Sequence, residues 1–189
     1  MKKIIVVLVV LISTLSIGQN EVFKFDQTIP GVKKEKLAII SGTYIVINTN
    51  GTPDELYQKT LDWVANTWID VEDVILTSPN NSFIKIQGTT KGILTARSAM
   101  RQGTTAKYRL TFKFKENKIK MEVTSLEAFI QPSKYNRAGW DNRNEIPIIN
   151  KKGNPYKYGV KEVSLFETYL NSLATDFKNY SEEDSEEGW

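Results

Sequence analysis

The feature that most constrains the fold is the alternation of apolar and polar side chains across residues 107–129. Apolar residues occupy every second position from 108 to 114, and they resume at every second position from 119 to 123. A period of two places all of these apolar side chains on one face of an extended chain. With Glu116-Asn117 as the turn, the pattern predicts an antiparallel β-hairpin with one buried face and one wet face.

The wet face of this predicted hairpin is rich in cations: Lys107, Arg109, Lys113, Lys115, Lys118 and Lys120. Such a face is one way to attract nucleic acid. Proteins that bind single strands, however, place aromatic rings among the charges on the same face, whereas Tyr108 and Phe112 alternate onto the opposite face. We therefore interpret the basic face as a solvated sheet surface and expect no nucleic-acid partner. Nucleic-acid binding stays the third candidate function.

Residues 52–68 carry the clearest helix signal. Thr52 supplies an N-cap hydroxyl, Pro53 suits the first helical position, and Glu55 stands three residues after the cap. Apolar residues then recur at helical spacing from Tyr57 to Trp68. The sequence predicts an amphipathic helix in which both Trp63 and Trp68 pack into the core.

The remaining elements define the fold class. Residues 43–48, 71–77 and 82–87 are typical of strands, because β-branched residues or alternating patterns end in turn-forming residues. Helical periodicity returns over residues 160–180. Strands clustered between two helices predict an α+β protein, with an antiparallel sheet of about five strands and two helices on one face.

Residues 1–18 are typical of a secretory signal peptide. Lys2 and Lys3 precede the apolar run 4–12, and small residues lead to a predicted cleavage site after Gly18. The alternative, a membrane anchor, needs about 20 apolar residues, and this run is shorter. We expect a secreted or periplasmic protein with no stable membrane span once the signal is removed.

The sequence predicts a single α+β domain over residues 19–180, followed by an acidic tail at 181–189. The domain carries 23 basic and 17 acidic residues, a net charge of +6, and five carboxylates crowd into the tail. A mildly basic body with an acidic end is thus the charge layout of the chain.

The chain contains no histidine and no cysteine. This excludes Ser-His-Asp and Cys-His catalysis, imidazole and thiolate metal ligands, and disulfides. Acidic clusters at 70–73 and 141–145 lack the glycine-centred loop of a calcium site, and we interpret both as solvated. We assign no catalytic residue, no metal and no cofactor, and we lean against an enzyme.

Residues 131–159 show no period over 29 positions, yet they hold aromatic and arginine residues of the kind that dominate binding hot spots. Two interpretations stay open: the rings staple a loop onto the sheet, with 146–149 as a minor strand, or they line a concave surface for a glycan, peptide or partner. The candidate ligand-binding residues are Tyr135, Arg137, Trp140, Arg143, Tyr156 and Tyr158.

One part of the chain resembles a known family. The stretch from Gly51 to Tyr57, followed by Leu61-Asp-Trp-Val64, is similar to the helix motif of domain of unknown function 4468. That is a family of secreted bacterial proteins with a TATA-binding-protein-like fold. The resemblance covers roughly residues 40–130, implies the same order of strand, helix, strands and helix, and carries over no catalytic residue.

The hairpin tip departs from the family pattern. It reads Lys115-Glu116-Asn117-Lys118, where the family usually has a glycine. Asparagine tolerates a left-handed turn position better than other non-glycine residues, so we expect the turn geometry to survive.

The expected function is that of an exported, non-enzymatic module that binds a cell-envelope or extracellular partner or ligand. The alternative is a hydrolase or lyase that uses carboxylates, tyrosine or arginine. A pocket floor where carboxylates converge with Arg or Tyr would favour this alternative.

Overall fold

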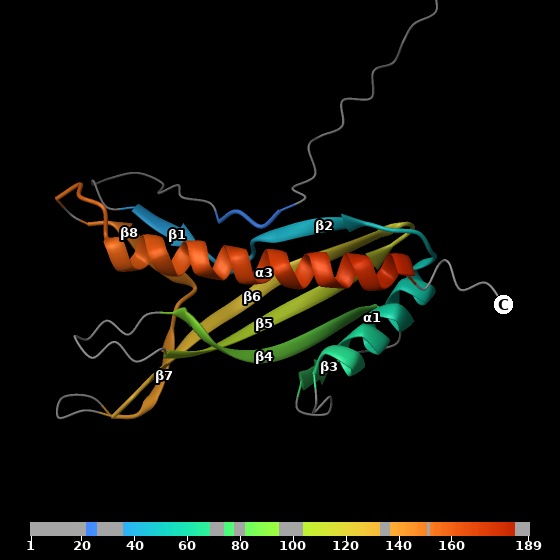
Figure 1. Ribbon diagram of the computed structural model, residues 1–189, viewed down its shortest axis with the longest axis horizontal. Helices are drawn as coiled ribbons and strands as arrows, with labels where there is room; N and C mark the ends of the chain where they lie inside the picture. Colours follow the sequence, from blue (N-terminus) through green and yellow to red (C-terminus); the bar gives the residue numbers. More distant parts are fainter. Residues whose placement is uncertain are drawn as a thin grey trace, which may run out of the picture.

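The computed structural model describes residues 22–25, 36–68, 74–77, 82–94, 104–132, 137–150 and 152–183 (Figure 1). The predicted signal peptide, the acidic cluster at 70–73 and residues 184–189 of the tail lie outside the described residues, as does Tyr135. None of the helices within these ranges combines the length and the apolar character needed to cross a bilayer.

The main body is an antiparallel sheet of six strands. Its order is β2 (Tyr44–Asn48), β6 (Lys118–Ile130), β5 (Thr104–Lys115), β4 (Phe83–Leu94) and β3 (Ile75–Thr77). A sixth strand, β7 (Gly139–Asn142), pairs with the far end of β6. The outer edge of β6 is therefore shared by two short strands, with β2 beside 118–122 and β7 beside 127–130.

The two helices of the described ranges, α1 (Pro53–Thr67) and α3 (Lys157–Glu183), lie on one face of this sheet (Figure 1). A second, two-stranded sheet of β1 (Lys36–Ile39) and β8 (Glu145–Ile149) adjoins the first half of α3. The predicted class, an antiparallel α+β fold with two helices on one face, is confirmed. The large sheet has one strand more than expected.

The hairpin of β5 and β6 forms as predicted. Phe112 lies opposite Met121, and the last pair before the turn is Lys115 opposite Lys118. Asn117 adopts a φ of 57° at the tip, which confirms that asparagine takes the left-handed position here. Its backbone N–H also donates to the carbonyl of Gly51, 2.9 Å away, so the tip is tied to the segment that leads into α1.

Helix α1 begins with the predicted capping box. The Glu55 N–H donates to the Thr52 hydroxyl at 3.3 Å, and the Thr52 N–H donates to the Glu55 carboxylate at 2.8 Å. This backbone hydrogen bond, together with one from the Thr52 hydroxyl, lowers the pKa of Glu55. Trp63 is buried as expected, but Trp68, the C-cap, is only half-buried.

The core lies between the sheet and the helices. Trp63 packs against Phe112 from β5 and Phe177 from α3, with ring centroids 5.9 and 5.0 Å away. Towards the other end of α3, Phe166 stacks on Phe25. Alternate residues of β4, β5 and β6 point into this layer, and the residues between them form the opposite face of the sheet, which neither helix covers.

Residues 131–159 are not the periodless loop that the sequence indicated, although the minor strand expected at 146–149 is confirmed as β8. This stretch contains β7 and β8, and α3 starts at Lys157 rather than 160 and continues to 183. The four-residue β7 is too short to display a period, and in β8 the run Ile146-Pro147-Ile148-Ile149 hides the alternation of buried and partly exposed positions. The partner of β8 is also remote, since Ala38 pairs with Ile146. Such non-local pairing leaves no local sequence signal.

Candidate functional site: the open face of the sheet

The structure separates the candidate residues of the 131–159 stretch. Trp140 lies on β7, Arg143 lies in the turn between β7 and β8, and Tyr156 and Tyr158 lie where α3 begins. Arg137 is exposed just before β7. The ring centroids of the two tyrosines lie 6.3 Å apart. The backbone N–H of Tyr156 donates to the carbonyl of Ile148 on β8. Both tyrosines lie beside the small sheet, whereas Trp140 belongs to the large one.

Arg143 is the candidate whose position differs most from a surface role, because only 2% of it is exposed. One terminal nitrogen of its guanidinium lies 3.2 Å from the Asp141 carboxylate. The backbone N–H of Arg143 donates to the carbonyl of Leu126. Two further side-chain nitrogens are buried without a partner within the described part of the chain. Arg143 therefore fixes the turn after β7 and does not line an open surface.

Trp140 is 44% exposed and stands on the face of the sheet opposite the helices. It pairs with Phe129 of β6, whose ring it meets edge-on at 5.3 Å. The ammonium group of Lys107 lies 4.3 Å from the centre of its indole and forms an ion pair with Glu127. A tryptophan, a lysine and a glutamate from three neighbouring strands thus form one cluster.

A second cluster of an aromatic ring, a lysine and a glutamate occupies the other end of this face. The Lys120 ammonium lies 3.9 Å above the ring of Tyr44 on β2, and 2.9 Å from the Glu122 carboxylate. Burial alone raises the pKa of Glu122, but the hydrogen bond and charge of Lys120, assisted by Lys113, outweigh burial and lower it. Glu122 is therefore an anion that holds two lysines against the sheet.

Between these clusters the face is strongly basic. Strand register places eight cations on it: Lys85, Lys91, Lys107, Arg109, Lys113, Lys115, Lys118 and Lys120. Only two strand carboxylates, Glu122 and Glu127, share it. We call this surface, with Tyr44, Phe129 and Trp140, the open face. The hairpin's Tyr108 and Phe112 point into the core as predicted. The strands beside the hairpin, however, bring Tyr44 and Trp140 to the basic side, and Phe129 at the far end of β6 joins them.

The sequence reasoning missed Tyr44 and Phe129 as members of this surface. Tyr44 alternates with the buried Ile45 and Ile47, so a period of two could have placed it on the wet side. Phe129 carries no comparable signal, because the bulge in the β5–β6 pairing near Arg109 shifts the alternation ahead of it.

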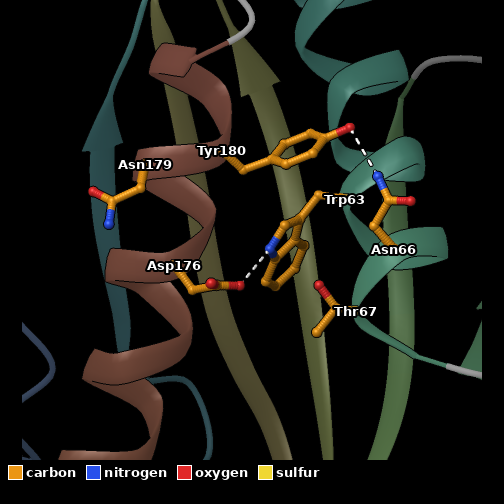
Figure 2. Close-up of a pocket in the computed structure, with 6 residues that line it drawn as sticks. All are labelled: Trp63, Asn66, Thr67, Asp176, Asn179 and Tyr180. Atoms are coloured by element: carbon orange, nitrogen blue, oxygen red, sulfur yellow. Dashed lines mark hydrogen bonds between the residues drawn. The ribbon is translucent and has the colours of Figure 1, made fainter.

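A pocket of about 460 Å³ lies between α1 and α3 (Figure 2). The indole N–H of Trp63 donates to the Asp176 carboxylate at 2.9 Å, and the Asn66 amide donates to the Tyr180 hydroxyl at 3.2 Å. Asn179 points away from these side chains in Figure 2. The pocket holds one carboxylate, already bound to Trp63, and its lining includes no arginine. It lacks the converging carboxylates that a hydrolase would require.

No three acidic side chains gather closely enough to hold a metal ion in the described ranges. A part-buried polar contact joins two phenols: the hydroxyls of Tyr108 and Tyr169 lie 2.7 Å apart. Burial, and then the neighbouring Tyr169, raise the pKa of Tyr108 far above its usual value, and burial also raises the pKa of Tyr169. Both phenols therefore stay protonated at neutral pH and are poor candidates for a catalytic base.

This phenol pair predicts a loss of stability in alkali. Unfolded tyrosines ionise near pH 10, while the folded pair keeps its protons, so the stabilisation is complete below pH 10 and declines as the pH rises above it. Tyr108→Phe should reduce the slope of unfolding free energy against pH by up to about 1.4 kcal/mol per pH unit. Urea unfolding at pH 8, 10 and 11 measures both slopes. Parallel slopes would contradict the assignment.

The architecture and the open face define an α+β protein with a TBP-like fold. Two solved structures share it: a TBP-like protein from Parabacteroides distasonis ATCC 8503, and a DUF4468 family protein from Bacteroides ovatus ATCC 8483. The first is 12% identical with a TM-score of 0.54, over 81% of this chain and 96% of its own. The second is 13% identical with a TM-score of 0.53, over 80% and 89%.

Residues 43–128 match the model of the domain of unknown function DUF4468 with TBP-like fold. This stretch is therefore similar to the DUF4468 domain, as the helix motif after Gly51 indicates. That match ends at Ala128, so it includes the basic hairpin but neither Trp140 nor helix α3. No curated protein matches the chain in sequence.

Proposed function

We propose that this chain is an exported, non-enzymatic module that binds a cell-envelope or extracellular ligand through the open face. The observation that carries the proposal is Trp140: a large ring, 44% exposed, on a sheet face that neither helix covers. Tryptophan is one of the residue types most enriched in binding hot spots. The pocket between α1 and α3, with its single engaged carboxylate, gives the hydrolase alternative little support.

Trp140→Ala is expected to abolish most ligand binding while leaving the fold intact. The ring's contact with Phe129 contributes only about 0.5–1.5 kcal/mol to stability, so the melting temperature should fall by a few degrees at most. The probe is soluble polysaccharide extracted from the envelope of the producing bacterium, and tryptophan fluorescence or calorimetry reports its binding. We expect a loss of affinity of about tenfold or more, as for a hot-spot residue.

The matched control is Tyr158→Ala, because Tyr158 is also an exposed ring, at 51%, but lies at the start of α3. This variant should bind as the parent does. Equal losses in the two variants, or unchanged binding by Trp140→Ala, would contradict the use of the open face.

Export is the second part of the proposal, and it is supported by the charge and apolar pattern of residues 1–18. We expect the protein recovered outside the cytoplasm to start at Gln19, which the intact mass of the purified product determines. Recovery in the membrane fraction with residues 1–18 retained would favour an anchor instead.

A further inference from the structure

We propose that the ligand of the open face is an anionic polysaccharide, bound along the cations of β5 and β6. This inference rests on the proposed function and names the chemical class of its ligand. It is carried by three observations: the register of the lysines, the location of the domain's excess charge, and the ammonium groups that lie over the exposed rings.

The register of the hairpin places like charges directly opposite one another. Lys113 lies across from Lys120, and Lys115 lies across from Lys118. Cross-strand pairs of like charge destabilise a sheet. The Glu122 carboxylate forms ion pairs with both lysines of the first pair, at 3.5 Å from the Lys113 ammonium and 2.9 Å from the Lys120 ammonium. Among the described residues no carboxylate forms an ion pair with Lys115 or Lys118. A bound anion would remove this repulsion.

The open face also holds the excess charge of the whole domain. Its eight cations and two carboxylates differ by six, which equals the difference between the 23 basic and 17 acidic residues of 19–180. The rest of the domain is thus balanced. From Lys107 to Lys115 the cations extend about 26 Å along β5, at about 3.3 Å per residue. This length suits a linear polymer better than a single small anion.

The rings and carboxylates of this face favour a polysaccharide over a nucleic acid. Single-strand binders stack bases on bare aromatic faces, whereas Tyr44 and Trp140 each already carry an ammonium group over one face. Glu122 and Glu127 repel any polyanion, a polyuronate included, but their carboxylates can accept hydrogen bonds from the many hydroxyls of a polysaccharide, which single-stranded DNA lacks. Arg109, held by Gln87 at 3.0 Å, offers further donors. Cations mixed with acceptors suit a ligand that carries both carboxylates and hydroxyls.

The test measures binding of polygalacturonate, a linear polyuronate, to the full chain by calorimetry in 50 and 200 mM NaCl. Neutral dextran and single-stranded oligothymidine are the comparison probes. The variant Lys115→Gln/Lys118→Gln should weaken polyuronate binding about tenfold, and the parent should itself lose about tenfold between the two salt concentrations. Because the variant removes a like-charge pair, its melting temperature should stay equal or rise, which separates a binding role from a structural one.

The control variant is Lys157→Gln/Lys161→Gln, which removes two exposed charges from the first turns of α3. It should bind polyuronate as the parent does. Equal weakening by the control, tighter binding of the oligothymidine, or no polyuronate binding at low salt would overturn the inference. Binding of a neutral envelope glycan that depends on Trp140 but not on Lys115 and Lys118 would refute the anionic ligand while the proposed function stands.

Discussion

Trp63→Ala should lower the free energy of unfolding by about 3–5 kcal/mol, the usual cost of deleting a buried indole. Trp63 is 1% exposed and contacts rings from α1, β5 and α3, so its removal opens a cavity where the two helices and the sheet meet. The hydrogen bond from its indole N–H to Asp176 is lost as well. Urea unfolding followed by circular dichroism measures the change.

Trp68→Ala is the matched control on the same helix. Trp68 is the half-buried C-cap residue and meets Trp63 edge-on at 5.2 Å, so its removal should cost clearly less than that of Trp63. Equal costs would show that α1 sits differently on the sheet, and an unchanged stability of Trp63→Ala would place its ring on the surface.

Gly88→Ala should cost about 3 kcal/mol, the upper part of the range for overpacking. Gly88 lies directly opposite Tyr108 in the β4–β5 register, and a Cβ at this position would overlap the Tyr108 ring and hydroxyl. Tyr108 is fully buried between Phe166 and Tyr169, at centroid distances of 6.4 and 5.4 Å. The ring therefore has no room to move aside.

A double-mutant cycle isolates this effect. In a Tyr108→Ala background the obstacle is gone, so Gly88→Ala should cost no more than about 0.5 kcal/mol, as at a position without packing constraints. Gly139→Ala is a second control, because a Cβ on Gly139 of β7 meets open space. Similar costs at Gly88 in both backgrounds would trace the penalty to the backbone instead of the Tyr108 ring.

The parts of the fold that could be predicted are those with local signals. The capping box at Thr52 and the hairpin from β5 to β6 each lie within one short stretch, where periodicity and turn chemistry act between neighbours. The pairing of β1 with β8 could not be predicted, because Ala38 and Ile146 are more than one hundred positions apart. Short strands of this kind gain their stability from tertiary contacts rather than from propensity.

The candidate site was predictable only in its separate pieces. The lysines of the hairpin and the exposed Trp140 were both identified from the sequence. Their meeting depends on the register of β7 against β6, which places Trp140 beside Phe129 and above Lys107. Arg143 was also a candidate from the sequence, but it does not join the site. The turn after β7 buries its side chain.

The shared outer edge of β6 has a consequence for how the chain behaves at high concentration. Between β2 and β7, loops satisfy the backbone of β6: Gly42 and Thr43 exchange hydrogen bonds with Val123, and Leu126 is bonded by Arg143 and Asn144. A thirteen-residue strand of this kind would otherwise be a template for edge-to-edge aggregation. Covered along its whole length by separate short segments, β6 offers no continuous ladder on which a second molecule could add a strand and start a fibril.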